Sequence, residues 1–157
     1  MSKKIIKIML ISILFFLIIS IASGVIWWYF ARTKPINASV RIGDNVFAVE
    51  IADTMTRRSA GLSERTSIGA RDGMLFIFSN PSIQRFWMRG MKFSIDIIWI
   101  RDGHIIGIEK AIPAPKTVIE SMNTYTSPEK VSEVLEVSGG TADVLGINVG
   151  DAISIIR

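Results

Sequence analysis

The chain has 157 residues, of which 49% are hydrophobic and 20% are charged, and its formal net charge is +4. This length supplies one domain and excludes a multidomain enzyme. The absence of cysteine excludes a disulfide scaffold, a thiolate zinc site, a cysteine nucleophile and a lipid-modified amino-terminal cysteine, while a single histidine excludes a multi-histidine metal site. From residue 31 onward the chain carries 15 basic and 14 acidic side chains, so its charge gives no support to nucleic-acid binding.

The first 30 residues divide into a basic head and a long apolar run. Residues 1–7 include three lysines, and residues 8–30 contain no charged side chain. A helix of this length spans about 34 Å, enough for a hydrocarbon core of ~30 Å. The head carries more positive charge than the residues after the run. We therefore expect a cytoplasmic amino terminus, a transmembrane signal anchor at residues 8–30 and a body outside the cytoplasm.

Two other interpretations of the apolar run remain open. Ser20-Ile21-Ala22 has the small-x-small pattern of a signal-peptide cleavage site, and cleavage near Ala22 would give a secreted body. Cleavage would, however, leave the apolar residues 25–30 exposed near a new amino terminus. The third interpretation is a helix buried in a soluble fold. Residues 31–39 are expected to form a short tether, within which Asn37 begins a glycosylation sequon.

Residues 40–157 are predicted to form the folded body. Runs rich in β-branched and aromatic residues, bounded by turn residues, predict seven or eight short strands. We expect these strands at residues 40–42, 46–51, 73–78, 83–88, 95–100, 104–112, 131–137 and 152–156. Two tight hairpins are indicated, one at Gly43-Asp44-Asn45 and one at Asp102-Gly103. The Asp-Gly pair suits a type I′ turn, which needs positive φ at both central positions.

Two short helices are also predicted. Asp53 is expected to cap the first, which ends at Ala60 before Gly61, and Gly139-Gly140 is expected to open the second. Residues 116–130 form a long polar connection. Short strands joined by turns predict a mainly β fold. We therefore expect a compact antiparallel barrel or sandwich-like domain with two short helices, preceded by one transmembrane helix.

Asp96 is the most informative carboxylate of the predicted body. It lies between isoleucines on an otherwise apolar strand. A buried carboxylate is costly unless a cation or hydrogen-bond donors stabilise its charge. The pattern favours a buried ion pair or a hydrogen-bonded turn anchor, and the candidate cations are Arg58, Arg65 and Arg89. A role as a general acid would require a second carboxylate nearby, which the sequence does not locate.

An aromatic and basic strip is the best candidate for a contact surface. Phe86, Trp87 and Met88 are followed directly by Arg89. On a strand, Phe86 and Met88 would face one side and Trp87 the other, so one of these faces could meet solvent or a ligand. Apolar side chains beside basic ones are typical of grooves for a peptide, a sugar or a lipid headgroup, although a strand in the core would explain the same pattern.

No sequence motif for catalysis or for cofactor or metal binding is present. The chain lacks a Gly-x-Ser-x-Gly elbow, a P-loop, a His-Glu-x-x-His helix and a calcium loop. His104 follows the Asp-Gly turn, where an exposed polar residue is expected. We therefore predict no cofactor, no metal and no assigned catalytic residue.

Several segments together carry a resemblance to a known family. They are Arg58-Ser59-Ala60-Gly61-Leu62-Ser63-Glu64-Arg65, Gly73-Met74-Leu75-Phe76-Ile77-Phe78, Phe86-Trp87-Met88-Arg89, Ile95-Asp96-Ile97-Ile98-Trp99-Ile100, Val134-Leu135-Glu136-Val137 with Gly140, and Gly146-Ile147-Asn148-Val149-Gly150-Asp151. From about Val46 to Ile155 the chain resembles the uncharacterised family called domain of unknown function 192. The resemblance implies a compact, mainly β barrel with short helices, often exported or tethered to a membrane, and it implies no activity.

The chain departs from the family pattern in two places. Arg89-Gly90-Met91 stands where the family commonly has Lys-Asn-Thr, and Ser94-Ile95-Asp96 stands where it commonly has Pro-Leu-Asp. The first departure removes two polar side chains beside the aromatic strip.

The leading functional interpretation is a non-enzymatic binding or accessory module. The bilayer would hold it through residues 8–30, and a protein, peptide or glycan would bind it, with no nucleic acid involved. The expected contact surface comprises Arg58, Phe86, Trp87, Met88, Arg89 and Asp96. Two alternatives are a hydrolase of envelope polymers that uses Asp96 as acid or base, and a structural subunit of a membrane complex.

Overall fold

The computed structural model divides the chain into two compact units, residues 1–35 and 36–157. In the first unit it describes residues 12, 13, 15, 16, 18–21 and 23, which have helical backbone, and in the second unit residues 36–156. Among the described residues, no helix has both the length and the apolar character needed to cross a membrane. The basic head, most of the predicted anchor and the first residues of the tether lie outside the described residues.

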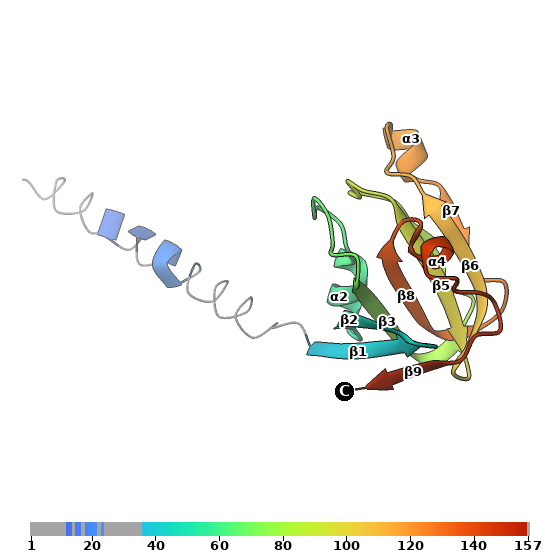
Figure 1. The fold of residues 1–157 in the computed structure, drawn as a ribbon. Coiled ribbons are helices and arrows are strands. Elements are labelled where there is room, and N and C mark those ends of the chain that lie inside the picture. Colours follow the sequence, from blue (N-terminus) through green and yellow to red (C-terminus); the bar gives the residue numbers. More distant parts are fainter. Residues whose placement is uncertain (1–11, 14, 17, 22, 24–35, 157) are drawn as a thin grey trace, which may run out of the picture. The chain divides into compact units, whose positions relative to one another are not determined.

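The second unit is mainly β, as predicted, with short helices between the strands (Figure 1). Its elements are β1 (Ile36–Ile42), β2 (Asn45–Ala52), α2 (Met55–Ala60), β3 (Asp72–Ser82), β4 (Arg85–Trp87), β5 (Ile95–Arg101), β6 (His104–Ile112), α3 (Val118–Ser121), β7 (Thr124–Thr126), β8 (Val131–Ser138), α4 (Thr141–Val144) and β9 (Ile153–Ile156). The first strand begins at Ile36, four residues before the expected start.

Seven strands form one sheet in the order β6-β5-β8-β3-β2-β1-β9, and β4 pairs with β7 in a separate ribbon. The expectation of an antiparallel domain is correct for every pair except β2 and β3, which run parallel. Parallel neighbours need a long crossover connection. The segment from Asp53 to Arg71, which contains α2, supplies that connection.

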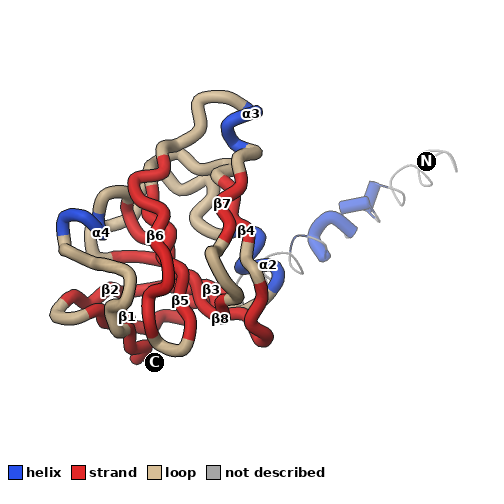
Figure 2. Tube along the Cα trace, turned by 90° about the vertical axis from the view of Figure 1, so that its right-hand side faces the viewer, coloured by secondary structure: helices blue, strands red, loops and turns tan. Residues whose placement is uncertain are grey.

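The sheet curls into a half-barrel (Figure 2). Its two edge strands, β6 and β9, come together where β6 begins. An isolated bridge joins His104 on β6 to Ala152 just before β9. The N–H of Ile105 donates to the carbonyl of Asp151 at 3.0 Å, and the N–H of Ile153 donates to that of Gly103 at 2.8 Å. These bonds occupy backbone groups that a free sheet edge would expose.

Two apolar clusters cover opposite faces of the central strands. Because side chains alternate along a strand, Leu75, Ile98 and Leu135 join one cluster while their sequence neighbours join the other. The first cluster lies against β1 and β2. The second is covered by Leu62 and by the segment containing Met88, both almost entirely buried. Burial on both faces explains why β3 and β5 are continuous apolar runs.

Local turn signals predicted the second hairpin turn and the end of the first helix correctly. At the second hairpin Asp102 has φ 51° and Gly103 has φ 73°, as a type I′ turn requires. The first helix ends at Gly61 with φ 51°, but Thr54 rather than Asp53 caps its start. Asp53 instead pairs with Arg57 at 3.1 Å. The expected helix count was too low, since the polar connection between β6 and β8 contains both α3 and β7.

Candidate functional site

A pocket of about 460 Å³ opens between α2, β3, β4 and β8. It brings together three of the predicted surface residues, Arg58, Phe86 and Trp87. Its lining comprises Met55, Arg58, Ser59, Ala60, Gly61, Leu62, Ser63, Phe76, Phe78, Ser82, Gln84, Arg85, Phe86, Trp87, Met91 and Glu136. We call it the β4 pocket. Its volume lies within the range of small-molecule sites, which are mostly apolar with a few polar groups.

The strand β4 divides the predicted aromatic strip between the core and the solvent. Phe86 packs edge-on against Phe76, with ring centroids 4.8 Å apart, and against Trp99, with centroids 5.6 Å apart. Met88 is buried in the same cluster with 1% of its surface exposed, whereas 57% of Trp87 is exposed. The expected alternation is therefore present. Met88 belongs to the core, and Trp87 forms part of the pocket wall.

Arginine side chains supply the positive charge at this pocket. Nη1 of Arg58 donates to the carbonyl of Asp53 at 2.6 Å and to that of Ile77 at 2.9 Å, and its guanidinium lies 5.1 Å from the ring centroid of Phe78. These contacts fix Arg58 against the pocket wall. The guanidinium of Arg89 lies 5.8 Å from the ring centroid of Trp87, a distance typical of a cation–π contact.

Glu136 is the buried acid of the β4 pocket. It lies on β8 between Met74 of β3 and Ile97 of β5, which are its register neighbours. Only 5% of the residue is exposed, and burial raises the pKa of its carboxyl to about 8. Its Oε2 has no hydrogen-bond partner among the described residues. An unpaired buried polar atom carries a desolvation cost and calls for an explanation.

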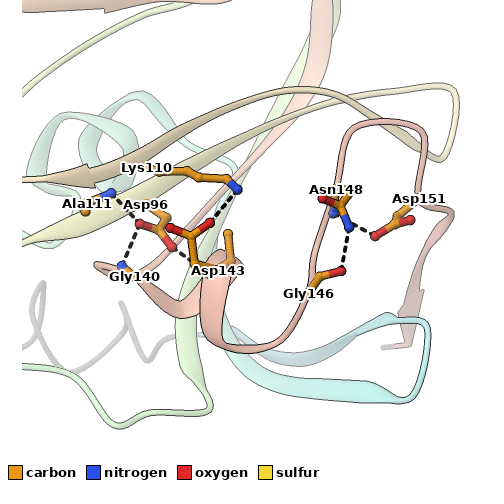
Figure 3. A network of polar contacts seen from close by, with 9 residues as sticks. Asp96, Lys110, Ala111, Gly140, Asp143, Gly146, Asn148 and Asp151 are labelled. Carbon is orange, nitrogen blue, oxygen red and sulfur yellow. Dashed lines mark hydrogen bonds and ion pairs between the residues drawn. The ribbon is translucent and has the colours of Figure 1, made fainter.

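Asp96 lies on the other face of the sheet and does not reach this pocket. Its Oδ1 accepts from the N–H groups of Ala111 at 2.7 Å and Gly140 at 2.8 Å, and its Oδ2 accepts from that of Ala142 at 2.7 Å (Figure 3). Asp96 is therefore a hydrogen-bonded turn anchor, one of the two interpretations that the sequence favoured. The other, an ion pair with Arg58, Arg65 or Arg89, is not what the structure shows, because the donors to both oxygens are backbone N–H groups.

The surroundings of Asp96 explain why the chain needs it. The register between β5 and β6 shifts beside Asp96, and Ala111 has φ 50°, a strained value for a residue with a side chain. The carboxylate stabilises this irregular segment and attaches α4 to it. Because Asp96 already occupies the N–H of Gly140, the Gly139-Gly140 turn is structural.

A second hollow, of about 520 Å³, lies beside the parallel pair of β2 and β3. Its charged residues are Glu50, Arg65 and Asp72. Arg65 donates to Glu50 at 2.5 and 2.9 Å, and Asp72 accepts from the N–H of Gly69 at 3.2 Å. The Arg65 hydrogen bond lowers the pKa of Glu50, opposed in part by burial, and the Glu50 bond raises the pKa of Arg65. Each of these three side chains already has a partner within the fold, so this hollow offers a ligand less than the β4 pocket does.

Comparison with known proteins assigns the family. A family model described as "Uncharacterized ACR", domain of unknown function 192, matches residues 38–155. The chain belongs to this family. Asp96, Glu136 and the lining of the β4 pocket all fall within the matched residues. No curated protein matches the chain.

Two solved structures have the same fold. A Sinorhizobium meliloti 1021 protein described as a proposed transcription regulator is 28% identical, with a TM-score of 0.69 over 78% of this chain and 95% of that chain. A Novosphingobium aromaticivorans DSM 12444 protein of unknown function is 30% identical, with a TM-score of 0.66 over 76% of this chain and 84% of that chain. The first relative consists almost entirely of the shared fold, so a body of this kind folds on its own.

Sequence reasoning missed Glu136 as a site residue, although it lies within a segment that carried the family resemblance. A two-residue period places Glu136 on the same face as Val134, so an acid shares a face with an aliphatic residue. That signal was available. What it could not provide is the identity of the strands on either side of β8.

The described residues include no group of three or more His, Asp or Glu side chains that could hold a metal ion. His104 is exposed beside its turn, as predicted, with Nδ1 3.0 Å from the carbonyl oxygen of Asp102. The β4 pocket offers a ligand the buried carboxyl of Glu136, two arginines, an aromatic wall and the polar residues Ser59, Ser63, Ser82 and Gln84.

Proposed function

We propose that this DUF192 protein is a non-enzymatic binding module and that the β4 pocket is its binding site. Glu136 carries the proposal, because a 95% buried acid with an unpaired oxygen lines a pocket of ligand size. Such a group costs stability unless something hydrogen-bonds to it. Phe76 and Phe86 offer apolar walls for the body of a ligand, and the exposed Trp87 offers a further aromatic surface at the same pocket.

A neutral aromatic probe, 4-phenylbutan-1-ol, tests this proposal with the isolated body, residues 36–157. We expect shifts in the amide NMR spectrum confined to α2, β4 and the middle of β8. Ala60→Trp places a large side chain on the exposed end of α2 at the pocket and should abolish these shifts. Val144→Ala removes an exposed apolar residue outside the β4 pocket and should leave them unchanged. Shifts spread over the whole surface, or equal in both variants, would contradict the proposal.

Membrane attachment remains part of the proposal, and it rests on the uncharged residues 8–30. The intact chain should stay with vesicles during an alkaline carbonate wash, and a chain lacking residues 1–30 should be released. An intact chain that washes off would overturn the attachment and, with it, the extracytoplasmic location. If the released chain instead begins after Ala22, the secreted alternative is correct.

The hydrolase alternative would now depend on Glu136, because hydrogen bonds occupy both oxygens of Asp96. A carboxyl with a pKa of about 8 is a suitable general acid. Among the residues that the structure describes, however, Glu136 is the only acid lining the β4 pocket, and hydrolysis by paired carboxylates needs two. Turnover of a glycan or peptide by the intact chain, lost in Glu136→Gln, would favour an enzyme over a binding module.

The description of the Sinorhizobium relative suggests a regulator that binds nucleic acid as another candidate. The near balance of charge from residue 31 onward does not favour it, since nucleic-acid binding needs a basic surface. We therefore keep a small-molecule or side-chain ligand as the proposed partner.

A further inference from the structure

The charges around the β4 pocket constrain the chemistry of its ligand. The charged residues of its lining are Arg58, Arg85 and Glu136. Since burial raises the pKa of Glu136 to about 8, its carboxyl is mainly protonated and neutral at pH 7. The lining then carries two positive charges and no negative charge.

Neighbouring acids do not cancel this positive charge, because each has a cation of its own. Asp53 pairs with Arg57 at 3.1 Å, and Glu64 pairs with Lys92 at 2.9 Å. Arg89, stacked on Trp87, adds a third cation at the same wall. A cationic ligand would meet repulsion here, whereas an anion would be attracted.

The interior of the pocket favours an apolar ligand body that carries a neutral polar group, rather than a charge. Phe76 and Phe86 form an aromatic wall, and the buried Glu136 lines the same pocket. A neutral carboxyl can both donate and accept a hydrogen bond, so a hydroxyl or carbonyl group would satisfy it. Neither register neighbour of Glu136, Met74 or Ile97, can do so.

We propose that the β4 pocket selects an amphipathic organic anion. Its carboxylate faces Arg58 and Arg85, its apolar body lies against Phe76 and Phe86, and a neutral polar group at its far end hydrogen-bonds to Glu136. This inference rests on the proposed binding function and adds the ligand class to it.

The inference predicts a pH dependence of binding. The register neighbours of Glu136, Met74 and Ile97, carry no titratable group, and neither do Leu62, Phe86 and Met91, which line the same pocket. Ionisation of Glu136 would bury a negative charge in the pocket and repel the anion. Affinity should therefore fall about tenfold between pH 7 and pH 9, as expected for a group with a pKa of about 8.

A matched series of three probes tests this inference on the isolated body by calorimetry. The probes are 4-(4-hydroxyphenyl)butyrate, 4-phenylbutyrate, which lacks the hydroxyl group, and 4-(4-hydroxyphenyl)butylamine, which replaces the carboxylate with a cation. At pH 7 we expect the hydroxy acid to bind best, the plain acid several-fold more weakly and the amine at least about tenfold more weakly, a difference of ~1.4 kcal/mol.

Four variants connect the probes to individual side chains. Arg58→Gln and Arg85→Gln should each reduce the preference for acid over amine. Arg85 is exposed, so its variant avoids any loss of the contacts that fix Arg58. Arg41→Gln on β1, outside the pocket lining, changes the net charge equally and should have no effect. Glu136→Gln should remove the decrease in affinity between pH 7 and pH 9, because its amide does not ionise.

Each outcome has a defined consequence. Equal or tighter binding of the amine, or an acid preference that survives both pocket variants, would overturn the ligand class and leave the binding module intact. Failure of all three probes to bind at millimolar concentration would overturn the ligand class, and it would overturn the proposed function only if 4-phenylbutan-1-ol also gave no shifts confined to α2, β4 and β8. A preference for the acid over the amine that disappears in Arg85→Gln and persists in Arg41→Gln would support both the ligand class and the proposed binding function.

Discussion

Asp96 and Glu136 lie on the adjacent strands β5 and β8, and both are buried, yet their surroundings differ completely. Three backbone N–H groups, donated by Ala111, Gly140 and Ala142, satisfy the carboxylate of Asp96. Glu136 faces the opposite side of the sheet and has an oxygen with no partner. The comparison teaches that a buried acid indicates structure when the fold supplies its donors, and a candidate site when the fold does not.

Replacing Asp96 should cause the largest change. Asp96→Ala leaves three N–H groups without an acceptor, and we expect a loss of about 5 kcal/mol of unfolding free energy in chemical denaturation. Asp143→Ala is the matched control, because Asp143 lies on the adjoining α4 but forms only a surface pair with Lys110 at 2.5 Å. That variant should lose less than about 1 kcal/mol. Equal losses of stability in the two variants would show that the hydrogen bonds of Asp96 do not stabilise the fold as proposed.

Glu136→Gln should raise the free energy of unfolding, whereas Asp96→Ala lowers it. The pKa of Glu136 is raised from 4.5 in the unfolded chain to about 8 in the folded one, so the folded state binds the proton more tightly. Stability of the unchanged protein should therefore be greatest below pH 4.5, fall as the pH rises to 8 and stay low above it. Relative to it, Glu136→Gln should gain about 3 kcal/mol at pH 7, and little at pH 4.

Denaturation at a series of pH values measures this effect. If both proteins give the same dependence between pH 5 and pH 8, Glu136 titrates normally and the contrast with Asp96 disappears.

Phe86 and Trp87 provide a second contrast, between a packed and an exposed aromatic side chain of the same pocket. Phe86→Ala removes a ring packed against Phe76 and Trp99 and should cost about 2–3 kcal/mol. Trp87→Ala removes an exposed ring and should cost about 0.5 kcal/mol while weakening the binding of aromatic probes. A large stability loss in Trp87→Ala would show that it supports the fold rather than the ligand.

Replacing Glu50 should change stability least, because its partner, Arg65, is partly exposed to solvent. Because Arg65 lowers the pKa of Glu50, the pair stabilises the fold above pH 4.5, and the contribution is lost as the pH falls through the lowered folded-state value. Solvent screening should limit the cost of Glu50→Gln to about 0.5 kcal/mol at pH 7. At pH 2 the variant and the unchanged protein should be equally stable by thermal unfolding.

The sequence predicted the features that depend on nearby residues. Asp102-Gly103 specifies its own turn, and the apolar runs of β3 and β5 specify strands that are covered on both faces. The parallel pairing of β2 and β3 was not predictable in this way, because nothing local states which strand a chain will meet after a crossover. The helix α3 had a local signal, Thr117 accepting from the N–H of Glu120, inside a stretch interpreted as loop.

The candidate site was only partly predictable for the same reason. Arg58, Phe86 and Trp87 were selected by residue type, and the structure places all three in the lining of one pocket. Met88 and Asp96 were selected too, and the fold buries both. Burial of Glu136 depends on Met74 and Ile97, which come from strands about 40 to 60 residues away in the chain. Only the assembled sheet brings these residues together.

The pairing of the first and last strands has a mechanical consequence. Ser39 of β1 stands opposite Ile156 of β9, so the folded body begins and finishes side by side. A force applied between these two points would load the β1–β9 hydrogen bonds one after another, like a zipper, instead of shearing them together. We expect β9 to peel away at low force in optical tweezers, while β2, β3 and β8 remain folded.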